Sequence, residues 1–202
     1  MKTAFRSLPV LATAATAILA ATPAFAHPGH DGAAGLSHGF LHPFSGLDHV
    51  LAMVAVGLIA ARIGGRAVVL VPLAFLGMMA VGGAMGAAGL ALPFVEIGIA
   101  LSVVVLGAAL AVRTALPVAG AMALVGAFAV FHGYAHGAEM PDSTSGLACG
   151  FGFVAATALL HAAGLGLGLA ATGLGTGAGR PALRLVGAGL AAAGLGLLVG
   201  AL

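Results

Sequence analysis

Apolar residues form long stretches along this chain, and polar residues are concentrated in the short segments between them. A helix needs about 20 mostly apolar residues to cross the hydrocarbon core of a bilayer. The pattern therefore predicts an all-α integral membrane protein, a bundle of about six transmembrane helices. The expected spans are 40–61, 67–90, 94–112, 115–136, 147–171 and 182–201.

The first 26 residues have the three parts of a cleavable secretory signal peptide. Lys2 and Arg6 give it a positive start, residues 8–21 are apolar but short for a span, and AFA at 24–26 is typical of a cleavage site. An uncleaved first helix is the alternative. The predicted domains are a signal peptide at 1–26, a short periplasmic histidine-containing tail at 27–39 and a six-helix transmembrane domain at 40–202.

The charged residues between the predicted spans differ in sign from one side to the other. Arginines follow the first and third spans and lie between the fifth and sixth, whereas acidic residues occupy other connections. Because basic loops stay in the cytoplasm, the arginine side is predicted to be cytoplasmic and both mature termini periplasmic. This describes a multi-pass protein of the bacterial inner membrane. The arginines concerned are Arg62, Arg66, Arg113, Arg180 and Arg184.

Composition agrees with this class of protein. Hydrophobic residues make up 61% of the chain and charged residues 6%, too few to cover a water-facing surface. Lys2 and Arg6 belong to the signal peptide, so the formal charge of +2 is no evidence for nucleic-acid binding. Cys149, without a second cysteine, is interpreted as a small buried residue. The glycine-rich last two spans predict close helix packing, with a homo-oligomer interface as the alternative.

A first group of polar residues lies in the first predicted span. A titratable group in hydrocarbon costs at least ~2.5 kcal/mol, so it usually marks a functional pathway. His42 and His49 share one helix face, and Asp48 is expected to orient His49 or to approach a metal itself. Because Pro43 follows it, His42 is expected at or just before the helix start. Packing roles for these side chains are the alternative.

A second group is FHGYAHGAE at 131–139, near the periplasmic end of the fourth predicted span. His132 and His136 are spaced so that both imidazoles can reach one ion from one helix face. An interfacial polar edge is the alternative. Glu139 follows in a loop and is interpreted either as part of the site or as a solvated side chain.

Two further titratable residues lie in other predicted spans. Glu96, in the periplasmic half of the third span, is expected to be a metal ligand or a proton carrier, with structural hydrogen bonding as the alternative. His161, in the middle of the fifth span, is assigned to a pathway in preference to packing. His27 and His30 in the tail either collect metal weakly or are incidental.

These motifs resemble those of the HupE/UreJ family of small bacterial membrane proteins. The resemblance rests on HPFSGLDH at 42–49, PFVEIGIALS at 93–102, FHGYAHGAE at 131–139 and GFVAATALLH at 152–161. It implies a bundle of about six helices that admits nickel, sometimes cobalt, for hydrogenase or urease maturation. The family motifs are matched here by His42, Asp48, His49, His132, His136 and the third-span carboxylate Glu96.

The sequence thus predicts uptake of a divalent transition metal, Ni²⁺ in the first place, since histidine and carboxylate ligands suit such ions. Co²⁺ or another divalent metal stays open, and no tightly bound cofactor is expected. Uptake should weaken below about pH 6, because protonated imidazole does not bind metal. The expected order of binding is His42, His132 and His136 first, then His49, Asp48 and Glu96, with His161 further in.

Two other classes of function are alternatives to transport. An intramembrane zinc hydrolase would use three histidines as ligands, Asp48 or Glu96 as base and the Ser102 hydroxyl, but no HExxH motif is present. A haem-ligating electron carrier would use the paired histidines. The chain also has no Walker motif, which argues against direct ATP hydrolysis. We therefore expect a transporter and not an enzyme.

Overall fold

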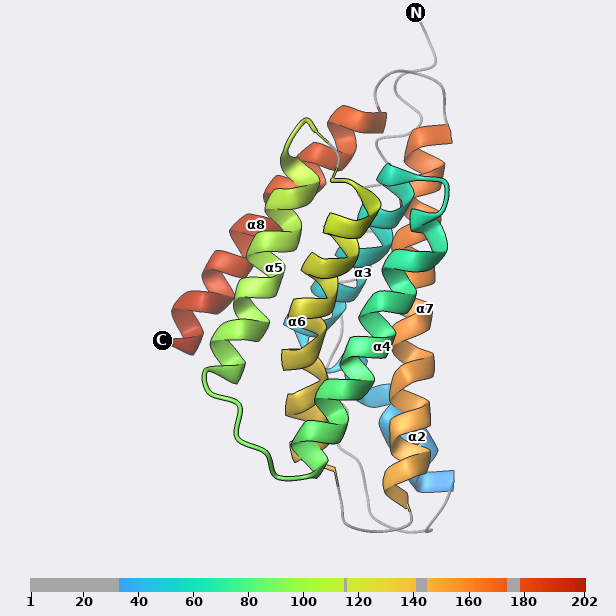
Figure 1. The fold of residues 1–202 in the computed structure, drawn as a ribbon. Coiled ribbons are helices and arrows are strands. Elements are labelled where there is room, and N and C mark those ends of the chain that lie inside the picture. Colours follow the sequence, from blue (N-terminus) through green and yellow to red (C-terminus); the bar gives the residue numbers. More distant parts are fainter. Residues whose placement is uncertain (1–32, 115, 141–144, 174–178) are drawn as a thin grey trace, which may run out of the picture.

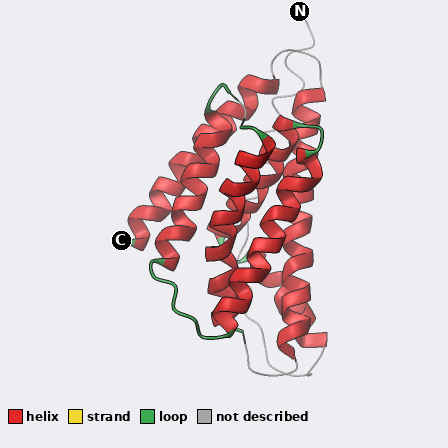
Figure 2. Ribbon diagram, in the orientation of Figure 1, coloured by secondary structure: helices red, strands yellow, loops and turns green. Residues whose placement is uncertain are grey.

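The computed structural model describes residues 33–114, 116–140, 145–173 and 179–202, so the predicted signal peptide lies outside the described part. Helices make up nearly all of these residues, and no strand occurs among them (Figure 2). The first described helix carries the label α2 (Figure 1). The order is α2 Ala33–Leu41, the 3₁₀-helix η1 His42–Phe44, α3 Leu47–Ile63, α4 Ala67–Ala87, α5 Val95–Ala111, α6 Val118–Ala138, α7 Ser145–Gly173 and α8 Gly179–Ala201.

The predicted all-α membrane bundle is confirmed, whereas the predicted six spans are matched in part. Four described helices, α4, α6, α7 and α8, are long and apolar enough to cross a membrane. The segment formed by α2 and η1 meets α3 at a bend of 80°, and the two together count as a fifth span if they cross the membrane as one broken helix. Helix α5 has 17 residues, which at about 1.5 Å per residue span less than the ~30 Å hydrocarbon core. By length alone the described chain has four or five spans.

The first predicted span, 40–61, is wrong as a single helix. The chain forms η1 at His42–Phe44, becomes extended at Gly46 with φ −98° and ψ 118°, and begins α3 at Leu47. Pro43 lacks a backbone N–H, and glycine loses more conformational freedom in a helix than other residues, so both favour a break here. His42 therefore precedes the α3 helix, as predicted, and it shares no continuous helix face with His49.

Successive long helices alternate in direction, so their connections fall at two ends of the bundle (Figure 1). The guanidinium of Arg62 donates hydrogen bonds of 2.5 to 3.1 Å to four carbonyls at and just after the end of α5. Arg184 in α8 donates to the carbonyl of Ala111 at 3.0 Å. These contacts join the end of α3, the end of α5 and the start of α8. The predicted gathering of arginines on one side is thus confirmed, and we call this side the arginine end.

Glycines allow the closest approaches between helices. A Cβ on Gly133 of α6 would collide with the carbonyl of Met79 in α4, and one on Gly137 would collide with the carbonyl of Gly83. The order of these pairs shows that α4 and α6 run parallel. Comparable glycine contacts join α3 to α7 and α5 to α8. The glycine-rich last two spans therefore pack closely inside the bundle, as predicted, chiefly against α3 and α5.

Candidate metal site

A row of histidine side chains runs inward from the end of the bundle opposite the arginines, which we call the histidine end. The ring centroids of His42 and His136 are 4.9 Å apart, those of His136 and His49 are 5.0 Å apart, and those of His49 and His132 are 5.0 Å apart. Elements η1, α6 and α3 supply these rings. Two motifs separated by more than 80 residues therefore meet in space.

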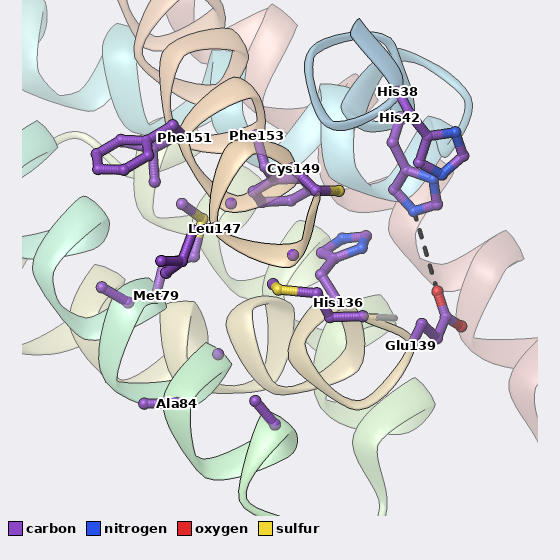
Figure 3. Close-up of a pocket in the computed structure, with 17 residues that line it drawn as sticks. His38, His42, Met79, Ala84, His136, Glu139, Leu147, Cys149, Phe151 and Phe153 are labelled. Atoms are coloured by element: carbon purple, nitrogen blue, oxygen red, sulfur yellow. Dashed lines mark ion pairs between the residues drawn. The ribbon is translucent and has the colours of Figure 1, made fainter. Parts of the chain in front are cut away.

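The outer part of the row is a group formed by His42, His136 and Glu139. Each offers one ligand atom, and these atoms all lie within 4.8 Å of one another. Figure 3 shows the side chains of His42 and Glu139 pointing toward each other. Their Nε2 and Oε2 atoms are 4.0 Å apart, and the Glu139 side chain is 71% exposed. Two imidazoles and one accessible carboxylate are a donor set that suits a borderline divalent metal keeping some of its water.

A second convergence of ring nitrogens lies deeper. The Nδ1 atom of His49 is 3.2 Å from Nδ1 of His132 and 3.4 Å from Nε2 of His136. Two nitrogens that each lie ~2.1 Å from one ion, with an N–metal–N angle of about 100°, are separated by about 3.2 Å. Each of these two separations thus fits a pair of imidazoles on one ion, and His49 is common to both pairs. Because His136 belongs to both groups, an ion can pass between them without losing all its protein ligands.

Ser102 of α5 sets the orientation of the deepest ring in this cluster. Its hydroxyl donates to the carbonyl of Ile99 at 2.6 Å and lies 2.9 Å from Nε2 of His132. Since the single hydroxyl proton goes to the carbonyl, the hydroxyl oxygen accepts a hydrogen bond from Nε2–H of His132. Neutral His132 then carries its lone pair on Nδ1, the atom that faces His49. The hydrogen bond to Ser102 thus leaves Nδ1 of His132 as a candidate metal-binding atom.

One aromatic side chain, Phe153 of α7, holds three of the rings in place. Its ring centroid lies 4.2 Å from that of His136, 5.0 Å from that of His49 and 6.4 Å from that of His42. Nothing in the sequence indicated this role, because a phenylalanine in an apolar span resembles any packing residue. No charge or spacing pattern distinguishes it.

The two carboxylates predicted as ligands lie elsewhere. Asp48 accepts a hydrogen bond of 2.7 Å from the backbone N–H of His49, an arrangement that is favourable at a helix start. Glu96 is exposed in the first turn of α5. Neither belongs to the group of metal-ligand atoms found among the described residues. Glu139, for which the sequence left two interpretations, supplies the carboxylate instead.

One histidine, His132, occupies a position that differs from the expected order, whereas His161 lies further in, as expected. His132, expected at the mouth with His42 and His136, is fully buried one turn deeper on α6. His161 is also buried, at 2% exposure, and its ring contacts Phe75 of α4 with centroids 5.1 Å apart. The described row is therefore His42, His136, His49 and His132, with His161 beyond it.

A cavity of about 450 Å³ adjoins the outer group (Figure 3). His38, His42, His136 and Glu139 line one part of it, and mostly apolar residues of α4 and α7 line the rest. Cys149 also lines the cavity and is only half-buried, so the expectation of a buried cysteine is met in part. The cavity gives the outer ligands room for an ion that still carries water.

Comparison with known proteins agrees with this arrangement of motifs. The model of the family described as "HupE / UreJ protein" matches residues 15–197. The chain belongs to the HupE/UreJ family. Protein HupE of Rhizobium leguminosarum bv. viciae is 46% identical over 182 residues, which cover 89% of this chain and 93% of that protein. No solved structure shows a significant match. The family expected from the motifs is confirmed, and with it a membrane protein that is not an enzyme.

Proposed function

We propose that this HupE/UreJ protein takes up a divalent transition metal, Ni²⁺ in the first place, across the bacterial inner membrane for hydrogenase or urease maturation. The observation that carries the proposal is the convergence of His42, His136 and Glu139 at the histidine end, continuous with His49 and His132 inside the bundle. Family membership supports it. The metal is the transported substrate and not a resident cofactor.

The path is proposed to begin at the outer group. An aqueous ion exchanges part of its water for two imidazoles and the accessible carboxylate of Glu139. It then moves to His49 and His132 while His136 stays bound. Several sites of moderate affinity suit transport better than one closed cage, because the ion must also leave.

The direction of uptake is proposed from the distribution of charge. Arginines gather at one end of the bundle, and membrane proteins keep such loops in the cytoplasm. The histidine end is then periplasmic. Asp48 and Glu96 are assigned supporting positions at that end, with Asp48 fixing the start of α3 and Glu96 exposed near the surface.

A zinc hydrolase is the less favoured alternative. Its chemistry needs a carboxylate base beside a metal-bound water in an enclosed site. The carboxylate at the outer group, Glu139, is largely exposed, and Asp48 is hydrogen-bonded to the backbone of its own helix. Family membership also argues against an enzyme.

Accumulation of radiolabelled nickel by cells that produce the full chain tests the proposal. His136→Ala should abolish most of the uptake, because His136 belongs to both ligand groups. Glu139→Gln, which keeps size and removes charge, should lower uptake at least about tenfold at limiting nickel, about 1.4 kcal/mol of binding. His38→Ala is the matched control, since His38 lines the same cavity but lies outside both groups.

Competition by cobalt, zinc and copper then defines the substrate. Preferential competition by cobalt supports a nickel and cobalt carrier. Equal competition by all metals would reduce the proposal to a general divalent-metal carrier. Wild-type uptake by the His136→Ala and Glu139→Gln variants at normal membrane levels would contradict the assigned path.

A further inference from the structure

Beyond the histidine row, α7 carries two buried polar side chains without hydrogen-bond partners in the described structure. Thr157 is 0% exposed and its hydroxyl has no partner, and His161 is 2% exposed with both ring nitrogens unpaired. Buried polar groups are normally hydrogen-bonded, and a helical threonine can bond a carbonyl one turn back. Thr172 on the same helix does so, donating to the carbonyl of Gly168 at 2.9 Å. The unpaired state of Thr157 and His161 therefore points to a ligand.

These two side chains continue the face of α7 that touches the histidine row. Phe153, Thr157 and His161 follow one another at intervals of four residues, so they lie along one side of the helix. At 1.5 Å per residue, Thr157 is about 6 Å and His161 about 12 Å further along the axis than Phe153. Phe153 contacts the rings of His49 and His136. The polar positions of α7 thus extend from that cluster toward the arginine end.

Phe75 of α4 connects the two regions. Its fully buried ring contacts the ring of His132 with centroids 5.9 Å apart and the ring of His161 with centroids 5.1 Å apart. The Nε2 atom of His49 also has no hydrogen-bond partner. One aromatic ring is therefore in contact with both the histidine row and the unpaired side chains beyond it.

We propose that His161 and Thr157 form a second, inner binding site for the transported divalent metal. This inference rests on the proposed transport function and adds a separate position to its path. One imidazole nitrogen and one neutral hydroxyl are a weaker donor set than the outer group. A weak site further along the path favours onward release, which conduction requires. His49 delivers the ion to this site.

Equilibrium binding of Co²⁺ to the purified full-length protein in detergent tests the inner site without any transport step. The double variant His42→Ala with Glu139→Gln removes the outer group and is expected to retain bound Co²⁺. Adding His161→Ala to this double variant should lower the number of ions bound per chain and change the visible spectrum of the remaining Co²⁺. Identical binding and spectra with and without His161→Ala would overturn the proposal.

Thr157→Val provides an independent test because it keeps the side-chain shape and removes the hydroxyl. In the same double-variant background it should weaken inner-site binding, whereas the control Thr172→Val should not. Equal binding by both threonine variants would contradict a role for Thr157, even if His161→Ala failed to fold. Nickel uptake distinguishes the transport proposal from the inner-site proposal. Absence of uptake by the wild-type protein would refute transport. The Co²⁺ binding measurements alone decide whether the inner site exists.

Discussion

Single hydrogen bonds decide which ring nitrogens in the histidine row are free to bind a metal. Ser102 occupies Nε2 of His132 and so leaves Nδ1 of His132 facing Nδ1 of His49. Phe153 restricts the rotation of His136 by ring contact. The candidate site therefore depends on neighbouring side chains that orient its imidazoles, as is general where histidines bind a metal.

Removing the Ser102 hydroxyl should weaken the deeper cluster selectively. In Ser102→Ala, Nε2 of His132 loses its acceptor, so the ring can adopt the wrong tautomer or rotate. Loss of such a supporting partner typically lowers metal affinity about 10- to 100-fold. Titration of the purified protein with Co²⁺ measures this change, and Thr172→Val serves as the hydroxyl-loss control on another helix. Unchanged affinity in Ser102→Ala would show that this hydrogen bond does not prepare His132.

The residues of the row could be predicted from sequence because titratable side chains are costly in apolar spans. His42, His49, His132 and His136 meet that criterion, and the structure brings them together. Glu139 stayed undecided because a carboxylate beside a loop can be solvated at no cost. Its position near His42 depends on how η1 meets α6, which spacing within either motif does not encode.

At the scale of helices, the apolar pattern predicted where each helix lies along the chain but not which helices pack against each other. The ends of α4 to α8 lie within a few residues of the predicted spans because the bilayer sets their length. The break before α3 was missed, although Pro43 and Gly46 both favour it. The parallel pairing of α3 with α7 and of α4 with α6 depends on glycine contacts between distant segments, which periodicity does not specify.

A methyl group at the α4–α6 contact should separate these helices and disturb the histidines on α6. In Gly133→Ala the new Cβ would meet the backbone carbonyl of Met79, which cannot move aside as a flexible side chain can. Such overpacking typically costs about 1–3 kcal/mol. Thermal unfolding in detergent should show the loss. Gly77→Ala on α4 is the control, because its Cβ meets no atom within 4 Å. Equal melting temperatures for both variants would contradict the assigned contact.

Arg62 should be important for joining α3 to α5 at the arginine end. Arg62→Ala removes the hydrogen-bond donors of four backbone carbonyls at and just after the end of α5. We expect the free energy of unfolding to fall by about 1–3 kcal/mol, a modest loss because the site is partly exposed. Arg62→Lys should recover little because an ammonium lacks the planar fork. Chemical denaturation of the purified variants measures the effect. Arg113→Ala is the control, because it removes the same charge from the same end of the bundle. If Arg113→Ala destabilises the protein as much as Arg62→Ala does, a specific role for Arg62 is contradicted.

At the scale of the whole molecule, the two ends of the bundle differ in chemistry. One end carries arginines that bind helix-terminal carbonyls, and the other carries imidazoles and an exposed carboxylate. This asymmetry gives the proposed metal path a direction. It also predicts which end faces the cytoplasm, because arginine-rich connections are retained there.

Reporter fusions test that orientation. Alkaline phosphatase, which is active only outside the cytoplasm, should be active when fused after Leu202 and inactive when fused after Arg113 in the α5–α6 connection. The first fusion lies at the end of α8, and the second lies at the arginine end. The reverse pattern of activity would place the histidine end in the cytoplasm and would contradict uptake through it.

Metal flux into vesicles containing the purified full-length protein tests the central claim most directly. A metal-quenched dye inside the vesicles reports Ni²⁺ arrival after the ion is added outside. The wild-type protein and the His38→Ala control should quench the dye at similar rates, whereas His49→Ala and His136→Ala should approach protein-free vesicles. Equal rates for wild-type, His49→Ala and His136→Ala proteins would contradict a path for the metal through the histidine row.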